Sequence, residues 1–326
     1  MKYFFILTLF SINFIYGQTK INGLSFVASN REISEEAITP VIDINANWVT
    51  LMPFAFMKNI ADTSIIYNNK RQWLGERKEG IAKTALAFHN KKIKIMLKPQ
   101  IWIPNGFTGH IKMKSELEWV KLEKNYELFI IDYVKLAQKT NCEIFCIGTE
   151  LNNFVIERPA FWKKLILKIR KLYSGKITYA ENWDTYQNVP FLSDLDYIGI
   201  DAYFPLSTEK TPSIASLSKA WIPIKNEIKL LSKKLNKKIL FTEFGYQSKN
   251  FTAKEPWEHN TKTEVNLKAQ ENTLAIILAI FWKEDWFEGG FLWKWYDNHE
   301  VIGGINDTDY TIQNKPAEKI VEKFYK

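Results

Sequence analysis

Short apolar runs alternate with longer segments of helical period along most of the chain. Each run is too short for a helix and is continuously apolar, which is typical of a strand in a parallel sheet that is buried on both faces. We predict eight such strands, at residues 24–28, 48–52, 93–97, 144–148, 177–180, 197–200, 239–241 and 290–293.

The segments between these strands are long enough for helices. In residues 116–138 apolar side chains recur every three or four positions, including Leu117, Val120 and Val134, and residues 266–282 show the same period. Strands that alternate with helices in one domain of this length predict the α/β class and a single (β/α)8 TIM barrel. A doubly wound open sheet is the alternative, but no glycine-rich dinucleotide loop follows the first strand.

The first residues are a separate segment. Met1-Lys2 precedes an apolar stretch that runs from Tyr3 to Tyr16 and ends at Gly17, which is the pattern of a signal peptide. The stretch is shorter than the ~20 apolar residues of a membrane span. We therefore expect a signal peptide at residues 1–17, export to the periplasm or the cell exterior, and one domain over residues 18–326 without a membrane span. A retained amino-terminal anchor is the alternative.

Composition adds few constraints. The chain of 326 residues is 46% hydrophobic and can bury a large core. The net charge of +8 comes largely from scattered lysines, and the chain has no nucleic-acid motif, so we expect no nucleic-acid partner. We also expect a monomer. Cys142 and Cys146 would lie about 13 Å apart on a strand, beyond the ~7 Å reach of a disulfide, and are expected to be buried thiols.

Two of the predicted strands deliver a glutamate at the carboxyl end, Glu150 and Glu243. Either residue alone could be simply the first polar residue after a core strand. In a barrel, however, the carboxyl ends of all strands converge on one mouth, so the two glutamates can form a pair of carboxylates over a single site.

Acids, amides and aromatic residues crowd the other predicted strand ends. Aromatic faces stack on the C–H faces of sugar rings, and carboxylates and amides bind hydroxyls, so this rim indicates a carbohydrate cleft. Strand alternation predicts that Trp293 and Trp295 face the same side. The residues expected to bind a poly- or oligosaccharide are Lys98, Trp102, Asn152, Asn182, Trp183, Asp201, Trp293 and Trp295. Four tryptophans at helical spacing are assigned to the core, namely Trp119, Trp162, Trp221 and Trp282.

Other chemistries lack their motifs. The four histidines are isolated, so we expect no metal site and no cofactor, and there is no Gly-x-Ser-x-Gly elbow for a serine nucleophile. Lys98 is the one candidate for a Schiff base, and its simpler role is a hydrogen bond to substrate or a salt bridge with a rim acid.

Acids after the fourth and seventh strands are the arrangement of the retaining glycoside hydrolases of clan A. Within that clan, residues 23–324 resemble glycoside hydrolase family 113, whose characterised activity is chiefly that of a β-1,4-mannanase. The motifs that carry the resemblance are Leu97-Lys98-Pro99, Gly148-Thr149-Glu150-Leu151, Ile198-Gly199-Ile200-Asp201-Ala202-Tyr203, Phe241-Thr242-Glu243-Phe244-Gly245 and Asn314-Lys315-Pro316-Ala317-Glu318.

The resemblance implies a role for four positions. Glu150 would be the general acid/base and Glu243 the nucleophile, with Tyr203 orienting Glu243 and Trp293 serving as a sugar platform. The implied reaction is double displacement at β-1,4-mannosidic linkages of mannan or glucomannan, with the two carboxyl groups about 5–5.5 Å apart.

Two positions depart from the family pattern and leave the substrate open. Thr149 stands where the clan usually has an asparagine for the sugar 2-hydroxyl, a role that Asn152 or Asn182 can fill, and Gln100 stands where many relatives have a histidine. A retaining enzyme for another β-glycan is one alternative, because neither the fold nor the carboxylates encode the sugar. A non-catalytic glycan-binding barrel is the other, and the presence of both glutamates argues against it.

Overall fold

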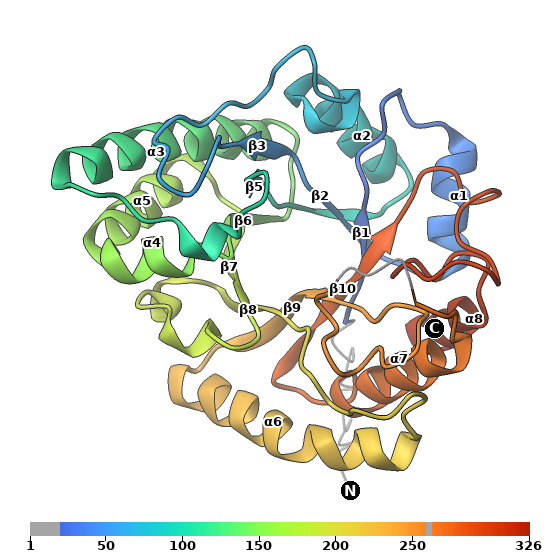
Figure 1. The fold of residues 1–326 in the computed structure, drawn as a ribbon. Coiled ribbons are helices and arrows are strands. Elements are labelled where there is room, and N and C mark those ends of the chain that lie inside the picture. Colours follow the sequence, from blue (N-terminus) through green and yellow to red (C-terminus); the bar gives the residue numbers. More distant parts are fainter. Residues whose placement is uncertain (1–19, 259–262) are drawn as a thin grey trace, which may run out of the picture.

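The computed structural model describes residues 20–258 and 263–326. Its centre is a closed barrel of parallel strands surrounded by helices (Figure 1). Each predicted strand overlaps one barrel strand, and the predicted (β/α)8 barrel is confirmed. In chain order the barrel strands are β1 (Ile21–Phe26), β2 (Trp48–Leu51), β4 (Lys94–Leu97), β6 (Ile144–Thr149), β7 (Lys176–Asn182), β8 (Tyr197–Asp201), β9 (Lys238–Phe244) and β10 (Phe287–Trp295).

Helices cover the outside of the barrel (Figure 1). They are α1 (Glu35–Asp43), α2 (Lys78–Asn90), α3 (Glu116–Lys139), α4 (Asn152–Glu157), α5 (Pro159–Leu172), α6 (Ile214–Leu235), α7 (Leu267–Phe281) and α8 (Pro316–Tyr325). The connection from β7 to β8 differs, because it holds only the short 3₁₀ helices Tyr186–Asn188 and Leu192–Asp194. Pro190 lies between these two turns and prevents a longer helix.

Two prolines create a small second sheet that the hydrophobic pattern did not predict. Pro53 follows β2 and Pro99 follows β4, and a proline cannot donate to the strand ladder. The chain therefore leaves the barrel and continues as two short paired parallel strands, β3 (Phe54–Phe56) and β5 (Gln100–Trp102). This sheet stands at the carboxyl ends of β2 and β4.

The core has two parts. Between the barrel and the helices, aromatic rings pack around the fully buried Trp162, whose ring centroid is 5.2 Å from that of Tyr126 and 5.3 Å from that of Phe191. Inside the barrel, an apolar plug closes the base and consists of Ile21, Met96, Ile144, Cys146, Ala180, Leu240 and Phe291.

Several predictions about the core and the termini can be compared with this structure. Trp119, Trp162 and Trp221 are buried as predicted, and Trp282 is partly buried against the same cluster. Both cysteines are buried free thiols. The predicted signal peptide lies outside the described residues and stays a prediction. No helix in the described part of the chain is long and apolar enough to cross a membrane.

Candidate active site

A cleft of about 840 Å³ opens at the carboxyl ends of the barrel strands. Of the residues that the sequence nominated, it is lined by Trp102, Glu150, Asn182, Trp183, Tyr203, Glu243 and Trp293. The cleft therefore brings together Glu150 and Glu243, which are far apart in the sequence.

Glu243 is held by three donors from three strand ends. Its Oε1 accepts hydrogen bonds from the Lys98 ammonium and from Gln100 Nε2, the latter at 3.2 Å. Its Oε2 accepts a hydrogen bond from the Tyr203 hydroxyl at 2.7 Å. An ionised carboxylate only accepts hydrogen bonds, so three donors match that form. Burial and the neighbouring Glu243 raise the pKa of Tyr203, which keeps its donated proton.

A register shift in β9 aims Glu243 at the cleft. The pairing of β8 with β9 changes from Ile200 opposite Phe241 to Asp201 opposite Glu243, so one extra residue of β9 is accommodated. Such a bulge re-aims a side chain at the end of a strand. Thr242 and Glu243 consequently both reach the polar interior, where Thr242 Oγ1 donates to Asp201 Oδ1 at 2.7 Å.

Lys98 and Asp201 lie beneath the floor of the cleft rather than on its lining. Neither side chain is exposed, and Lys98 Nζ is 3.3 Å from Asp201 Oδ1. Burial lowers the pKa of Lys98, but the carboxylates of Asp201 and Glu243 outweigh it and raise the pKa overall. Lys98 is thus a protonated cation that binds Glu243, and a protonated lysine is not the nucleophile of a Schiff base.

Asp201 is the second carboxyl group that contacts the buried Lys98 ammonium. Burial and Glu243 raise the pKa of Asp201 to about 7, whereas Lys98 and Thr242 act against the rise. The structure therefore places both residues behind Glu243, where they position its carboxylate, and does not bring them to the surface that a substrate would touch.

Glu150 has a different environment. It follows β6 with a left-handed backbone, φ 51°, which is uncommon for a residue with a side chain. Its N–H donates to Ala180 O at 2.8 Å, and the next N–H, of Leu151, donates to Tyr179 Oη at 2.7 Å. These bonds to β7 fix the unusual backbone.

The carboxyl group of Glu150 is half buried at the cleft. Among residues 20–258 and 263–326, no side chain donates a hydrogen bond to it. Burial, followed by the carboxylates of Asp201 and Glu243, raises the pKa of Glu150 well above its usual value. The cleft thus contains one carboxyl group that accepts three hydrogen bonds and one whose pKa is raised, so that it holds a proton more strongly.

Glu181 is a further buried acid, located on β7 beneath the Glu150 backbone. Tyr179 Oη donates to Glu181 Oε2 at 3.0 Å, and Thr185 Oγ1 donates to its Oε1 at 3.1 Å. Burial raises the pKa of Glu181 to about 7, although these hydrogen bonds lower it in part. Because its side chain is only 1% exposed, it supports Tyr179 and does not line the cleft.

Aromatic side chains stand at the mouth on both sides of β6, the strand that precedes Glu150. Trp183, after β7, stacks on Trp257, after β9, with ring centroids 5.2 Å apart. On the other side, Trp102 of β5 meets Phe54 of β3 edge to face at 6.4 Å. Trp102 is 56% exposed and Trp257 44%, so large ring surfaces are open to a ligand.

Sequence reasoning missed several cleft residues because they lie in long loops. Trp257 belongs to the loop between β9 and α7, and Tyr310 to the loop between β10 and α8. Neither follows a strand directly, so strand-end spacing could not find them. The signal that was available is an aromatic residue in a long loop at the carboxyl-terminal face of a barrel.

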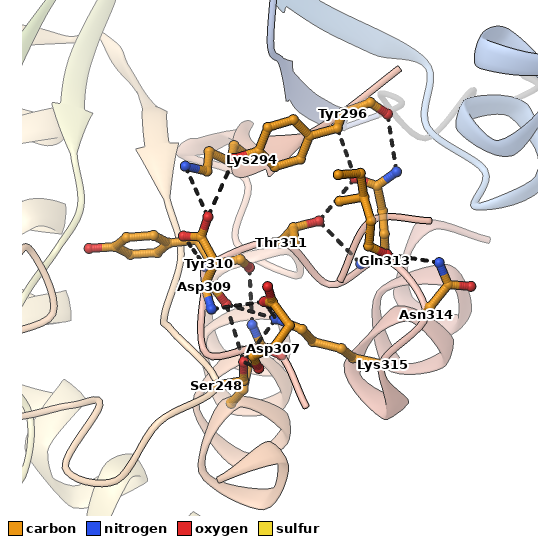
Figure 2. Close-up of polar contacts among 12 residues, drawn as sticks. Ser248, Lys294, Tyr296, Asp307, Asp309, Tyr310, Thr311, Gln313, Asn314 and Lys315 are labelled. Atoms are coloured by element: carbon orange, nitrogen blue, oxygen red, sulfur yellow. Dashed lines mark hydrogen bonds and ion pairs between the residues drawn. The ribbon is translucent and has the colours of Figure 1, made fainter. Parts of the chain in front are cut away.

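A polar network fixes the loop that carries Tyr310 (Figure 2). The buried Lys315 ammonium lies 2.5 Å from Asp307 Oδ1 and donates to Ser248 Oγ at 2.8 Å. Lys294, which lines the cleft beside Trp293, forms an ion pair with Asp309 Oδ2 at 3.2 Å. The Tyr310 ring consequently stays 6.0 Å from the ring of Tyr203, behind the phenol that binds Glu243.

Besides Lys98 and Asp201, two further predicted binding residues do not reach the cleft. Trp295 is fully buried in the outer core, because the register between β1 and β10 shifts between Leu24 opposite Leu292 and Phe26 opposite Trp295. This irregularity breaks the alternation on which the prediction relied. The Trp293–Lys294 peptide bond is cis. Asn152 begins α4, is half buried, and does not line the cleft.

Within the part of the chain that the structure describes, no group of three or more histidine, cysteine, aspartate and glutamate side chains is placed to hold a metal ion. The functional groups that line the mouth are carboxyls, amides, hydroxyls, phenols, the Lys294 ammonium and aromatic rings. Such a set can transfer a proton, supply a nucleophile and bind sugar rings.

Comparison with known proteins identifies the family. The sequence model of Glycoside Hydrolase Family 113 matches residues 26–315. The chain belongs to this family. The chain is therefore a glycoside hydrolase, and the barrel agrees with the family. A search of curated proteins finds no match.

Solved structures agree with the family assignment. The GH113 β-mannanase AaManA from Alicyclobacillus acidocaldarius, solved in complex with ManMIm, is 26% identical, with a TM-score of 0.80 over 94% of this chain and 97% of that one. A GH113 β-1,4-mannanase complex is 22% identical, with a TM-score of 0.81 over 94% and 98%. A β-glucuronidase from Ruminococcus gnavus shares the fold at 11% identity and a TM-score of 0.59, over 94% of this chain and 50% of that one.

The buried acid Glu181 generates a testable pH dependence of stability. Its folded pKa of about 7 exceeds the unfolded value of 4.5, so the folded state holds a proton that the unfolded state has lost between these two values. The free energy of unfolding therefore falls as the pH rises through this window, by about 3 kcal/mol for this group. In Glu181→Gln this loss should be absent.

The measurement is urea denaturation of wild type and Glu181→Gln at pH 4.5 and pH 8. We expect the free energy of unfolding of the variant, relative to that of wild type, to be about 3 kcal/mol higher at pH 8 than at pH 4.5. Parallel pH profiles for the two proteins would show that Glu181 ionises in the fold as easily as in the unfolded chain.

Proposed function

We propose that the chain is a retaining endo-acting hydrolase of β-1,4-mannosidic linkages in mannan or glucomannan. The observation that carries the proposal is the contrast between two carboxyl groups in one cleft. Glu243 accepts three hydrogen bonds, whereas the pKa of Glu150 is raised and its carboxyl receives none from the described side chains. The mannan substrate is supported by the family and by the similar structures, which are those of β-mannanases.

In the first step, protonated Glu150 gives its proton to the glycosidic oxygen while Glu243 attacks the anomeric carbon. The Tyr203 hydroxyl and the Lys98 ammonium hold the two oxygens of Glu243, so the attacking carboxylate is oriented before substrate arrives. In the second step, Glu150 has become a base and removes a proton from water, which releases the sugar from Glu243. Two inversions at one carbon retain its configuration.

The aromatic residues support action inside a chain. Trp183 and Trp257 stand on one side of Glu150, and Trp102 and Phe54 on the other, because β7 and β4 are the two neighbours of β6 in the barrel. A polymer can therefore contact ring faces on both sides of the cleaved bond. Trp293 lies between them as the platform for the reacting sugar.

Thr149 is the candidate for part of the sugar recognition. Its side chain lines the cleft, and its buried Oγ1 has no hydrogen-bond partner among the described residues. A buried hydroxyl is stabilised when it gains a partner, so a sugar hydroxyl at this point would compensate for its desolvation. Asn182 also lines the cleft and offers an amide for the same purpose.

The substrate is tested by release of reducing ends from purified polysaccharides. We expect release from linear β-1,4-mannan and glucomannan, and none from xylan or β-glucan. Glu243→Gln, purified in the same way, is the matched blank for contaminating hydrolases. Activity confined to xylan or β-glucan would show that the substrate is another β-glycan, although the family assignment would stand. No activity of wild type on any polymer would contradict the proposal.

The role of Glu150 is tested with Glu150→Ala. Without the acid, hydrolysis of mannan should fall by a factor of about 10²–10⁴, because the leaving group no longer receives a proton. An aryl mannoside with a good leaving group needs little protonation, and added azide needs no general base, so azide should restore part of its turnover. Cleavage of mannan at the wild-type rate would show that another group supplies the proton.

The role of Glu243 is tested by covalent trapping. A 2-fluoro mannosyl fluoride should form an ester that accumulates, and mass spectrometry of peptides should locate it on Glu243. Proton NMR in the first minutes of hydrolysis should show the β-anomer as the first product. An α-anomer would mean that water attacks the substrate directly, and a label on Glu181 or Asp201 would assign the nucleophile to another strand.

A further inference from the structure

A second hollow, of about 410 Å³, lies at the outer end of the small β3–β5 sheet. Its apolar wall consists of Phe56, Ile66 and Trp73, and its polar lining includes Asn69, Arg71 and Gln72. Trp73 is 54% exposed and Ile66 is 56% exposed. Two exposed apolar side chains gathered beside polar groups in one hollow form a surface that can bind a ligand.

The β3–β5 sheet joins this hollow to the cleft. In register, Phe54 is opposite Gln100, and Phe56 is opposite Trp102. Because side chains two residues apart share one face of a strand, these four residues form a single surface. Its inner end is Gln100, which hydrogen-bonds to Glu243, and Phe54 and Trp102 line the cleft. Its outer end is Phe56, which lines the second hollow.

The segment that carries Trp73 is fixed to this sheet. Phe56 and Ile66 exchange two backbone hydrogen bonds, at 2.8 and 3.0 Å. The Gln72 amide donates to the carbonyl oxygen of Phe54 at 2.7 Å. Trp73 is therefore held at a fixed place relative to the cleft, which is the condition for a binding position that acts together with it.

We infer that this hollow is a distal sugar-binding subsite, which binds a unit of the substrate chain remote from the cleaved bond. The Trp73 indole provides a face for the C–H side of a sugar ring. The Arg71 guanidinium and the Asn69 amide provide hydrogen bonds to its hydroxyls. This inference rests on the proposed function for the linkage that is cleaved, but its surface is defined independently of the two carboxyls.

A distal subsite makes activity depend on chain length. A long chain gains the extra contact, whereas a short oligosaccharide that occupies the catalytic positions cannot reach it. Binding energy from such a remote position raises kcat/KM for the long substrate alone. A residue with only a structural role would change both substrates alike.

The experiment compares Trp73→Ala with wild type on linear β-1,4-mannan and on mannotriose. We expect kcat/KM to fall about tenfold on mannan, the equivalent of 1.4 kcal/mol, and to stay unchanged on mannotriose. Trp73→Tyr keeps a ring and should recover most of the loss. The matched control is Leu230→Ala on α6, where another large apolar side chain is 67% exposed. Equal loss on both substrates, or no loss on either, overturns the subsite.

Affinity electrophoresis separates failure of the subsite from failure of the proposed function. Wild type and variants are run through gels that contain mannan, glucomannan, xylan or β-glucan, without any need for cleavage. Trp73→Ala should be retarded less than wild type in the gel that retards wild type most. Equal retardation of both proteins, or no retardation of wild type in any gel, rejects the subsite whichever glycan is cleaved. If Trp73→Ala does not fold, Arg71→Ala is judged by the same criteria.

Discussion

The ammonium group of Lys98, buried between the carboxylates of Asp201 and Glu243, is the interaction on which the polar centre of the barrel depends. Without this cation, the carboxylates of Asp201 and Glu243, which come from adjacent strands, would repel each other in a site that water does not reach. Removing one member of a buried ion pair typically costs about 3–5 kcal/mol, because the remaining charge has no partner. The cation lies below the cleft, so it can hold Glu243 without occupying the space of a substrate.

The two cleft glutamates differ because their strands end differently. Glu243 sits at a bulge in β9 that turns it toward donors from β4, β5 and the segment after β8. Glu150 sits on a left-handed turn after β6, where the hydrogen bonds engage the backbone and leave the carboxyl open to the cleft. The local backbone thus gives two residues of the same type different surroundings, three hydrogen-bond donors for Glu243 and a buried site that raises the pKa of Glu150.

The sequence predicted most of what depends on regular spacing. Apolar runs located the barrel strands, and their carboxyl ends located Glu150, Tyr203, Glu243 and Trp293 at one mouth. The predictions failed where a single residue interrupts a strand or shifts its pairing with a neighbour. Trp295 turns into the outer core because β10 is irregular, and the prolines after β2 and β4 produce the β3–β5 sheet. Loop residues such as Trp257 depend on long-range packing that no local pattern encodes.

The apolar plug at the base of the barrel determines how molecules move through the proposed reaction. Side chains such as Met96, Leu240 and Phe291 fill the interior below Lys98, so the two carboxyls face the mouth of the described barrel. In the proposed reaction, water for the second step therefore enters at the same face from which the departing half of the polymer leaves. Departure of the first fragment consequently makes room for the water that releases the second from Glu243.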